Sequence, residues 1–293
     1  MRLLSFKVDG DSHLGVRVGD EVVNLTVAAP KLPREMRQFV AAGAEAFEAA
    51  RSAMGTANSE ARHFWNKIDY QPVVSTPSKI LCLGVNFLEH ASEAGLSRPE
   101  FPPVFMRGPS TLIGHKQPMI RPAVSEQLDY EGELAVIIGR AARHVSTAGA
   151  LSYVAGYSVF NDGSVRDYQL RTSQWTLGKN FDGTGGFGPE LVTPDELPEG
   201  ASGLRLQTRL NGSVMQHSNT SKMIFGVAEC IAILSECLTL TPGDVIIMGT
   251  CAGVGLLRKP PVFMRPGDLC EVEIERIGVL SNPIAQEQWK PAA

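Results

Sequence analysis

The 293-residue sequence has few features of a secreted, membrane-spanning or disulfide-bonded protein. Its five cysteines are an odd number without a C-x-x-C pair, which predicts reduced thiols. No run approaches the roughly 18 apolar residues of a membrane span. The opening stretch MRLLSFKVDGDSH lacks the apolar core of a signal peptide. We therefore expect a cytoplasmic protein with no membrane partner.

An excess of positive charge is also absent. The 27 Lys and Arg residues are outnumbered by 31 Asp and Glu, giving a net charge of −4 at pH 7. Without a basic stripe, the chain is not expected to bind nucleic acid. The 43% of hydrophobic residues is enough for a substantial core, so a globular protein is expected.

Several common site motifs are missing or out of context. The stretch DGTGGFGP contains a literal G-x-G-x-x-G at Gly183, Gly185 and Gly188. No apolar strand precedes it, and Pro189 with a strand-like ELVTP follows where a nucleotide-binding helix would begin. A tight loop is predicted instead of a dinucleotide site. The six histidines are isolated, which argues against a histidine-rich zinc site.

What is present is a sequence rich in turns and strands, with 29 Gly and 19 Pro. Residues 1–30 predict a small β-meander, and a helix is predicted for residues 34–54. The expected buried stripe of this helix is Met36, Phe39, Val40, Ala44 and Phe47. A turn-rich segment follows, so we place a domain boundary near residue 72, dividing the chain into residues 1–72 and 73–293.

The larger part has clustered strands and few helices. Strands are predicted for KILCLGVN, LAVIIG, VAGYSVFND, VIIMGT and LCEVEIE, and helices for FLEHASEAG and residues 224–238. Because strands cluster rather than alternate with helices, the fold class is predicted as α+β.

The stretch DYEGELAVIIG places Glu131 and Glu133 two residues apart ahead of a buried strand. Side chains alternate along a strand, so both face the same way, about 7 Å apart. They form either a solvated strand end with cationic partners or one side of a metal site. Asp162 closes the strand VAGYSVFND and is a third candidate. Three carboxylates together would suit Mg²⁺ or Mn²⁺.

Three further residues allow two interpretations. Lys179 in QWTLGKNFD is either a surface charge or a cation facing a cleft. His90 and Glu93 lie three residues apart on one helix face. They are either a surface pair or a histidine base oriented by a carboxylate.

The motifs in their order resemble the fumarylacetoacetate hydrolase family over residues 79 to 285. The resemblance rests on DYEGELAVIIG, VAGYSVFNDGSVRDYQ, WTLGKNFD, GFGP, LNGSVMQ and PGDVIIMGTCAGVG. It implies a strand-rich mixed β-sandwich roll with a small N-terminal α/β domain. The chain looks similar to the bacterial two-domain, acylpyruvase-like branch, whose members are commonly homodimers.

The resemblance also implies roles for individual residues. Glu131, Glu133 and Asp162 would bind Mg²⁺ or Mn²⁺; His90, Glu93 and Lys179 would be catalytic; Gln169, Thr250, Arg107 and Arg166 would contact substrate. One departure is Cys251, which stands where the family has proline after the threonine.

The activity implied is hydrolysis of a C–C bond in a 2,4-dioxo acid such as an acylpyruvate or fumarylpyruvate. The cation would stabilise the enolate that forms when the bond breaks. The same enolate serves decarboxylation of oxaloacetate-like acids and isomerisation of 2-hydroxy-diene-dioates. A non-catalytic family member that binds small molecules is the alternative of another class.

Overall fold

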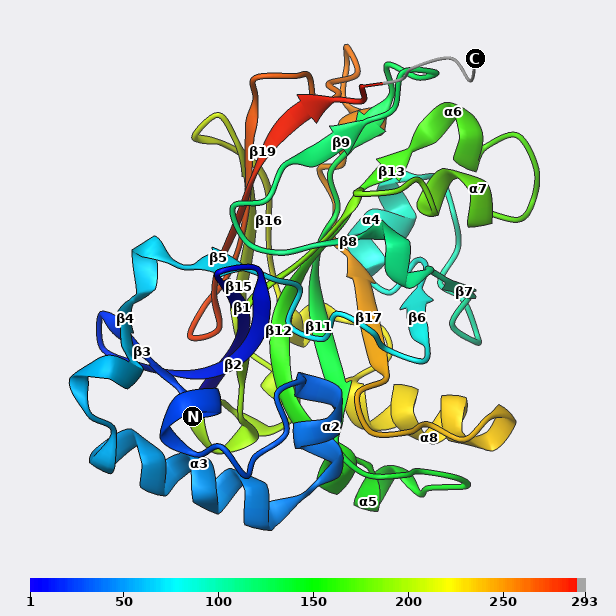
Figure 1. The fold of residues 1–293 in the computed structure, drawn as a ribbon. Coiled ribbons are helices and arrows are strands. Elements are labelled where there is room, and N and C mark those ends of the chain that lie inside the picture. Colours follow the sequence, from blue (N-terminus) through cyan, green and yellow to red (C-terminus); the bar gives the residue numbers. More distant parts are fainter. Residues whose placement is uncertain (289–293) are drawn as a thin grey trace, which may run out of the picture.

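The computed structural model describes residues 1–288 and contains one long mixed sheet (Figure 1). Its strand order is β4-β3-β2-β1-β14-β12-β11-β17-β6-β7, with β5 beside β1 and β8 beside β14. The twelve strands are β1 (Arg2–Val8), β2 (Asp11–Val18), β3 (Glu21–Asn24), β4 (Arg62–Phe64), β5 (Asp69–Tyr70), β6 (Ile80–Leu83), β7 (Val104–Met106), β8 (Leu112–Ile113), β11 (Gly132–Ile138), β12 (Val154–Asp162), β14 (Gly185–Val192) and β17 (Val245–Thr250).

A second sheet packs against the centre of the first, in the order β16-β15-β18-β19-β9. Its strands are β9 (Met119–Arg121), β15 (Arg205–Leu210), β16 (Ser213–Asn219), β18 (Leu269–Ile274) and β19 (Gly278–Gln286). One apolar core joins Leu134 and Val159 of the long sheet to Leu206 and Val272 of the second. A small pair, β10 (Leu128–Asp129) and β13 (Ser164–Val165), completes the strands. The predicted strand-rich α+β class is confirmed.

Helices lie at the two ends of the long sheet. They are α1 (Leu25–Ala28), α2 (Met36–Ala41), α3 (Ala44–Thr56), α4 (Leu88–Glu93), α5 (Thr147–Ala150), α6 (Arg166–Gln169), α7 (Thr176–Lys179) and α8 (Val227–Cys237). Short 3₁₀ turns cover 59–61, 65–67, 109–111, 151–153, 194–196, 199–201, 220–222 and 255–257. Helices α4, α6 and α7 gather at the end opposite α3, α5 and α8 (Figure 1). Over residues 1–288, every helix is too short or too polar to cross a membrane.

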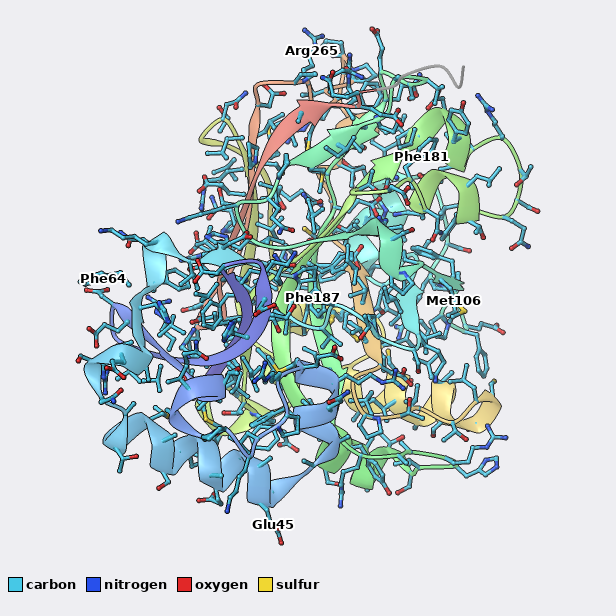
Figure 2. All side chains as sticks on the ribbon, viewed as in Figure 1. Glu45, Phe64, Met106, Phe181, Phe187 and Arg265 are labelled. Carbon is cyan, nitrogen blue, oxygen red and sulfur yellow. The ribbon has the colours of Figure 1, made fainter. Side chains whose placement is uncertain are left out.

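The N-terminal meander is present as β1, β2 and β3, as predicted. Its first strand pairs antiparallel with β14, with Arg2 opposite Val192. The sheet therefore continues across the boundary predicted near residue 72, and the two-domain division stays a prediction. Phe187 of β14 lies in the interior, whereas Phe64 of β4 lies at the periphery (Figure 2).

The literal glycine motif lies at and just before the start of β14. Gly185 opens that strand, which continues through Pro189 to Val192 where a nucleotide-binding fold would begin a helix. Gly185 and Gly188 therefore lie in a strand and not in the predicted tight loop, and this strand stands where a dinucleotide fingerprint would require a helix.

The single helix predicted for residues 34–54 is wrong. Two helices, α2 and α3, are separated by Gly43, whose φ is +70°. Glycine adopts such values readily, and they interrupt a right-handed helix. Ala44 is exposed, contrary to the predicted stripe, whereas Phe47 is half-buried and packs against the core. The other predicted stripe residues, Met36, Phe39 and Val40, are buried.

The helix predicted for residues 224–238 begins three residues late, at Val227. The backbone N–H groups of Ile224 and Phe225 donate to the backbone and side-chain oxygens of Asn86, at 2.7 and 2.8 Å. These contacts hold residues 224 and 225 outside the helix.

Strand β11 lies between β12 and β17, both antiparallel to it, and all seven of its residues are buried. Its first residue, Gly132, lies against the second sheet. A Cβ there would be 2.3 Å from Thr208 Oγ1 and 2.9 Å from Val272 Cγ1. A glycine is therefore required between Glu131 and Glu133, because the two sheets approach closely at this point.

Gly132→Ala should lower the free energy of unfolding by about 1–3 kcal/mol, because the added methyl group overpacks the junction of the two sheets. Urea denaturation measures this change. Gly55→Ala is the matched control: nothing lies within 4 Å of its Cβ, so stability should stay unchanged or rise by up to about 1 kcal/mol. Equal effects of the two substitutions would contradict this account of Gly132.

Candidate active site and metal centre

Three carboxylates meet where β11 and β12 pair. Glu131 immediately precedes β11, Glu133 is its second residue, and Asp162 ends β12. The backbone N–H of Asp162 donates to the carbonyl oxygen of Glu131 at 2.9 Å, which fixes the two chains at this point. One oxygen from each carboxylate lies within 4.8 Å of the others, and all three residues are buried. The structure thus brings together the three acids predicted from the sequence.

Two of the three carboxylates have cationic partners. Glu131 Oε1 lies 2.7 Å from Arg166 Nη2, and its other oxygen contacts Lys179. Burial would raise the pKa of Glu131, but Arg166 and Lys179 outweigh it and lower the pKa to about 2. Asp162 contacts Lys179 Nζ at 2.6 Å and Arg107 Nη1 at 2.5 Å. Glu131 is therefore held as a carboxylate, and Asp162 is paired with two cationic side chains.

Glu133 is different, because it forms no ion pair with Lys, Arg or His among the described residues. Its Oε2 accepts a hydrogen bond from the Gly249 backbone N–H at 2.5 Å. Burial raises its pKa well above the usual range, and the charges of Asp162 and Glu131 raise it further. Glu133 is the acid whose charge the protein itself does not compensate.

The charges of the wider cluster fit a divalent cation. Its acids and bases are Asp129, Glu131, Glu133 and Asp162 against Arg107, Arg166 and Lys179. With every group ionised, one negative charge is in excess. An all-carboxylate donor set suits Mg²⁺ or Mn²⁺. A divalent cation would compensate Glu133 and leave one positive charge for an anionic ligand.

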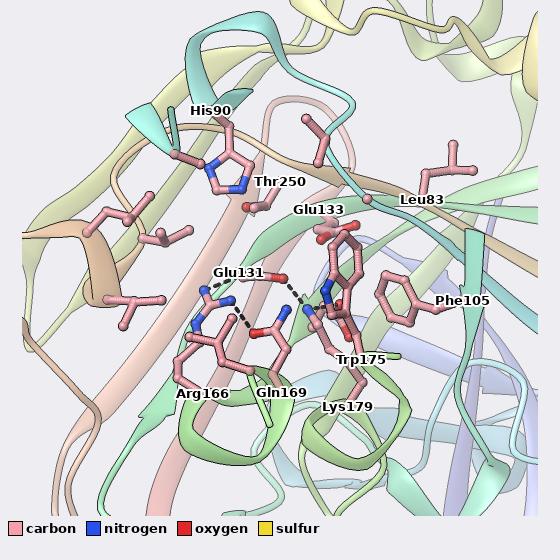
Figure 3. Close-up of a pocket in the computed structure, with 18 of the residues that line it drawn as sticks. Leu83, His90, Phe105, Glu131, Glu133, Arg166, Gln169, Trp175, Lys179 and Thr250 are labelled. Carbon is pink, nitrogen blue, oxygen red and sulfur yellow. Dashed lines mark hydrogen bonds and ion pairs between the residues drawn. The ribbon is translucent and has the colours of Figure 1, made fainter. Parts of the chain in front are cut away.

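His90 lies on α4 and lines the same cavity as the acidic cluster (Figure 3). Its Nδ1 lies 3.6 Å from Glu93 Oε2, an electrostatic contact rather than a hydrogen bond. Glu93 in turn accepts hydrogen bonds from the Gly253 N–H at 3.1 and 3.0 Å. Burial lowers the pKa of His90, so the ring is neutral at neutral pH. A neutral imidazole can act as a base.

The cavity has a volume of about 360 Å³ and lies beside α4, α6 and α7. Gln169 lines it and its Oε1 accepts a hydrogen bond from Arg166 Nη1 at 2.8 Å. Thr250 also lines it, but its hydroxyl donates to the Gly132 oxygen at 3.0 Å and accepts from Gln216 Nε2 at 2.8 Å. Thr250 is therefore already engaged in holding the start of β11.

Arg107 lies behind Asp162 instead of on the cavity wall. Its side chain is buried and donates to Asp162 at 2.5 Å, to Thr184 at 2.8 Å and to Thr111 at 3.3 Å. This arrangement favours a role in holding Asp162. Contact between Arg107 and substrate stays a prediction.

Sequence reasoning missed Asp129, which is fully buried below Arg166. It accepts from Arg166 Nε at 2.8 Å and from the backbone N–H groups of Gly255 and Leu256 at 2.8 and 2.9 Å. Asp129 thereby aims Arg166 at Glu131. The alternating acids of the DYEGE stretch, at positions 129, 131 and 133, were the available signal.

Comparison with known proteins gives consistent findings. Residues 79–285 match the family model described as fumarylacetoacetate (FAA) hydrolase C-terminal. The human mitochondrial oxaloacetate tautomerase FAHD2B is 37% identical over 290 residues, covering 97% of this chain and 91% of its own.

Two solved structures are similar throughout. Fumarylacetoacetate hydrolase from Exiguobacterium antarcticum has a TM-score of 0.85 and 31% identity, covering 98% of this chain and 100% of its own. Maleylpyruvate hydrolase from Sphingobium sp. SYK-6, in complex with manganese(II) and pyruvate, has a TM-score of 0.80 and 29% identity, with the same coverage.

Glu133→Gln should weaken Mn²⁺ binding by about 100-fold or more, because it removes the acid that depends on the cation. Stability without metal should stay nearly unchanged, because burial already favours the neutral form of Glu133 and glutamine has the same shape. Calorimetric titration with Mn²⁺ and urea denaturation measure the two effects. The exposed Glu126→Gln is the control and should change neither. Undiminished Mn²⁺ affinity in Glu133→Gln would contradict the assignment.

Proposed function

The chain belongs to the fumarylacetoacetate hydrolase family, and from this premise we propose that it is a divalent-cation-dependent enzyme that moves a proton at C3 of a 2-oxo acid. Oxaloacetate is the substrate to test first, since a relative similar over nearly the whole chain is described as an oxaloacetate tautomerase. The single observation that carries the proposal is that His90 and the triad of Glu131, Glu133 and Asp162 line one cavity.

A divalent cation, when bound, supplies Lewis-acid polarisation of a 2-oxo group. The residues of the chain supply the rest. Arg166, itself held by Asp129, keeps Glu131 ionised and in place, and Arg107 holds Asp162 in place. Lys179 lies at the same carboxylates and is the ammonium group available to the carboxylate or 2-oxo oxygen of the ligand.

His90 is the proposed base for tautomerisation. Its neutral ring takes a proton from C3, the electron pair of that C–H bond forms the C2–C3 double bond, and negative charge collects on the C2 oxygen. Lys179 stabilises that charge, and the proton leaves on the C2 oxygen with the enol product. The step consumes neither water nor an oxidant. Glu93 orients the ring and stabilises its protonated form.

Hydrolysis of a 2,4-dioxo acid, such as an acylpyruvate or fumarylpyruvate, is the second candidate. The His90–Glu93 pair favours it, and so does the similarity to a maleylpyruvate hydrolase described with manganese(II) and pyruvate. Here His90 takes a proton from water, and the hydroxide attacks the C4 carbonyl. The C3–C4 bond breaks and C3 gains a proton, giving pyruvate and a carboxylic acid.

Product analysis separates the remaining alternatives. Decarboxylation of oxaloacetate would release CO₂, and isomerisation of a 2-hydroxy-diene-dioate would shift its chromophore. A protein that binds Mn²⁺ but turns over none of these acids would support the non-catalytic alternative.

Some expectations from the sequence stay predictions. Substrate contacts by Gln169, Thr250 and Arg166 have support from their positions on the cavity wall. We keep the homodimer and the cytoplasmic location as proposals, while the human relative is described as mitochondrial.

His90→Asn should lower kcat for oxaloacetate enol–keto interconversion by about 10²–10⁴-fold, because the proposed base is lost. Mn²⁺ affinity should stay the same, because His90 is not a proposed ligand. Ultraviolet absorbance of the enol follows turnover after metal stripping and Mn²⁺ reloading. His217→Asn, at an exposed histidine, is the control. Full turnover by His90→Asn would rule out this role.

Activity should persist below the ordinary histidine pKa of about 6.5, because burial lowers the pKa of His90. The base works when neutral, so the rate falls only as pH drops through the lowered value. Glu93 raises the pKa of His90, and Glu93→Gln should therefore move the acidic limb to still lower pH. Profiles of kcat/KM against pH measure the acidic limb of the wild-type protein and of the Glu93→Gln variant. A shift toward higher pH in Glu93→Gln would contradict the pairing.

A further inference from the structure

The cavity divides into a charged part and an apolar part. Its apolar lining includes Leu83, Leu96, Phe105, Leu170, Trp175 and Leu256. Leu96 is 50% exposed and Leu170 is 63% exposed, so large apolar side chains on this wall contact water. An apolar group of a ligand would gain free energy by covering them.

The cationic groups on the cavity wall are already used at the charged part. Within residues 1–288, Lys179 and Arg166 are the only Lys or Arg on this wall. Arg166 donates from Nε to Asp129 and from Nη1 to Gln169, both at 2.8 Å, and its Nη2 forms an ion pair with Glu131 at 2.7 Å. Lys179 is the only ammonium group on this wall, and it forms ion pairs with Glu131 and Asp162 at the charged part. A second carboxylate reaching the apolar part would be buried without a partner, which is unfavourable.

Trp175 forms the apolar surface next to Lys179. Its ring centroid lies 5.7 Å from that of Phe105 at an interplanar angle of 74°, and Lys179 Nζ lies 5.1 Å from the Phe105 ring (Figure 3). The indole also lies directly against Gly84, where a Cβ would be 2.3 Å from Trp175 Cζ3. The missing side chain at Gly84 creates the space that the indole fills.

The aromatic wall and the ammonium group belong to one turn of chain. Trp175 is the N-cap residue of α7, and Lys179 is its last residue. The Lys179 N–H donates to the Trp175 carbonyl oxygen at 3.2 Å. Helix α7 would thus contact both the charged end of a ligand, through Lys179, and its apolar group, through Trp175.

From these observations we propose that the cavity binds 2-oxo acids whose substituent beyond C3 is an uncharged alkyl or aryl group, and that Trp175 determines this preference. The inference rests on the proposed 2-oxo acid chemistry and names its substrate class. The two carboxylates of oxaloacetate are separated by only two carbons, so both can share the charged part. The proposed substrates therefore include longer 2-oxo acids with an apolar group as well as oxaloacetate.

The test compares two ligands of equal length, 2-oxohexanoate and 2-oxoadipate, which lack the C4 carbonyl needed for hydrolysis and differ in a terminal methyl or carboxylate group. Pyruvate serves as the reference, and binding to the Mn²⁺-loaded protein is measured by calorimetric titration. 2-Oxohexanoate should bind about 10- to 50-fold more tightly than pyruvate, as its three extra carbons are buried. 2-Oxoadipate should bind no more tightly than pyruvate.

Two variants test the role of the indole. Trp175→Ala removes it, and Gly84→Ala displaces it through the added methyl group. In both, the preference for 2-oxohexanoate over pyruvate should fall to within about threefold, while pyruvate affinity stays the same. Leu177→Ala on α7 is the matched control, because this residue is exposed and lies outside the cavity wall. Circular dichroism confirms that each variant is folded.

Oxaloacetate turnover, measured in parallel, separates the two possible failures. If oxaloacetate is turned over but 2-oxoadipate binds as tightly as 2-oxohexanoate, the apolar preference is overturned and the proposed function stands. If the preference persists in both folded variants, the role of Trp175 is overturned. If pyruvate and both longer acids fail to bind and oxaloacetate is not turned over, the proposed function fails and the inference with it.

Discussion

The structure depends on charge compensation among carboxylates buried side by side. An ionised group loses its hydration on burial, and neighbouring charges of the same sign increase the cost. Arg166, Arg107 and Lys179 stabilise Glu131 and Asp162, but Glu133 has only a backbone N–H as a partner. This remaining imbalance supports the proposal that the cluster holds a cation and is not a closed network of ion pairs. Once a divalent cation is present, the cluster would have one positive charge in excess, which favours an anionic substrate.

The fold supports this cluster with close packing of the two sheets. Gly132 lets the second sheet approach the first at the point where Glu131 and Glu133 emerge. Gln216, from the second sheet, bonds the Gly132 N–H and the Thr250 hydroxyl, and so ties β16 to β11 and β17. Asp129 accepts hydrogen bonds from the Gly255 backbone N–H and from Arg166, and so holds both the loop at Gly255 and the Arg166 side chain. The acids are therefore held by both sheets, while His90 comes from the short helix α4. This arrangement suits a reaction that needs a rigid cation site and a base on a separate element.

Much of the architecture could be predicted from local patterns. The continuous apolar run of β11 and the acids at the strand ends are visible in the sequence, because strand periodicity places Glu131 and Glu133 on one face. The interruption at Gly43 was missed, because residues 36–54 keep a helical apolar spacing on both sides of it. The late start of α8 depends on Asn86, which is 139 residues away from Phe225 along the chain. Long-range hydrogen bonds of this kind, like those of Arg107 to Asp162, have no local sequence signal.

The most direct test of the central claim is anomalous diffraction from crystals soaked in Mn²⁺. The account predicts a manganese peak at about 2.1 Å from one oxygen each of Glu131, Glu133 and Asp162. It also predicts that His90 and Glu93 lie outside the coordination sphere. Full occupancy of a site elsewhere, or no peak at the triad at millimolar Mn²⁺, would contradict the claim that these carboxylates are arranged to hold a divalent cation.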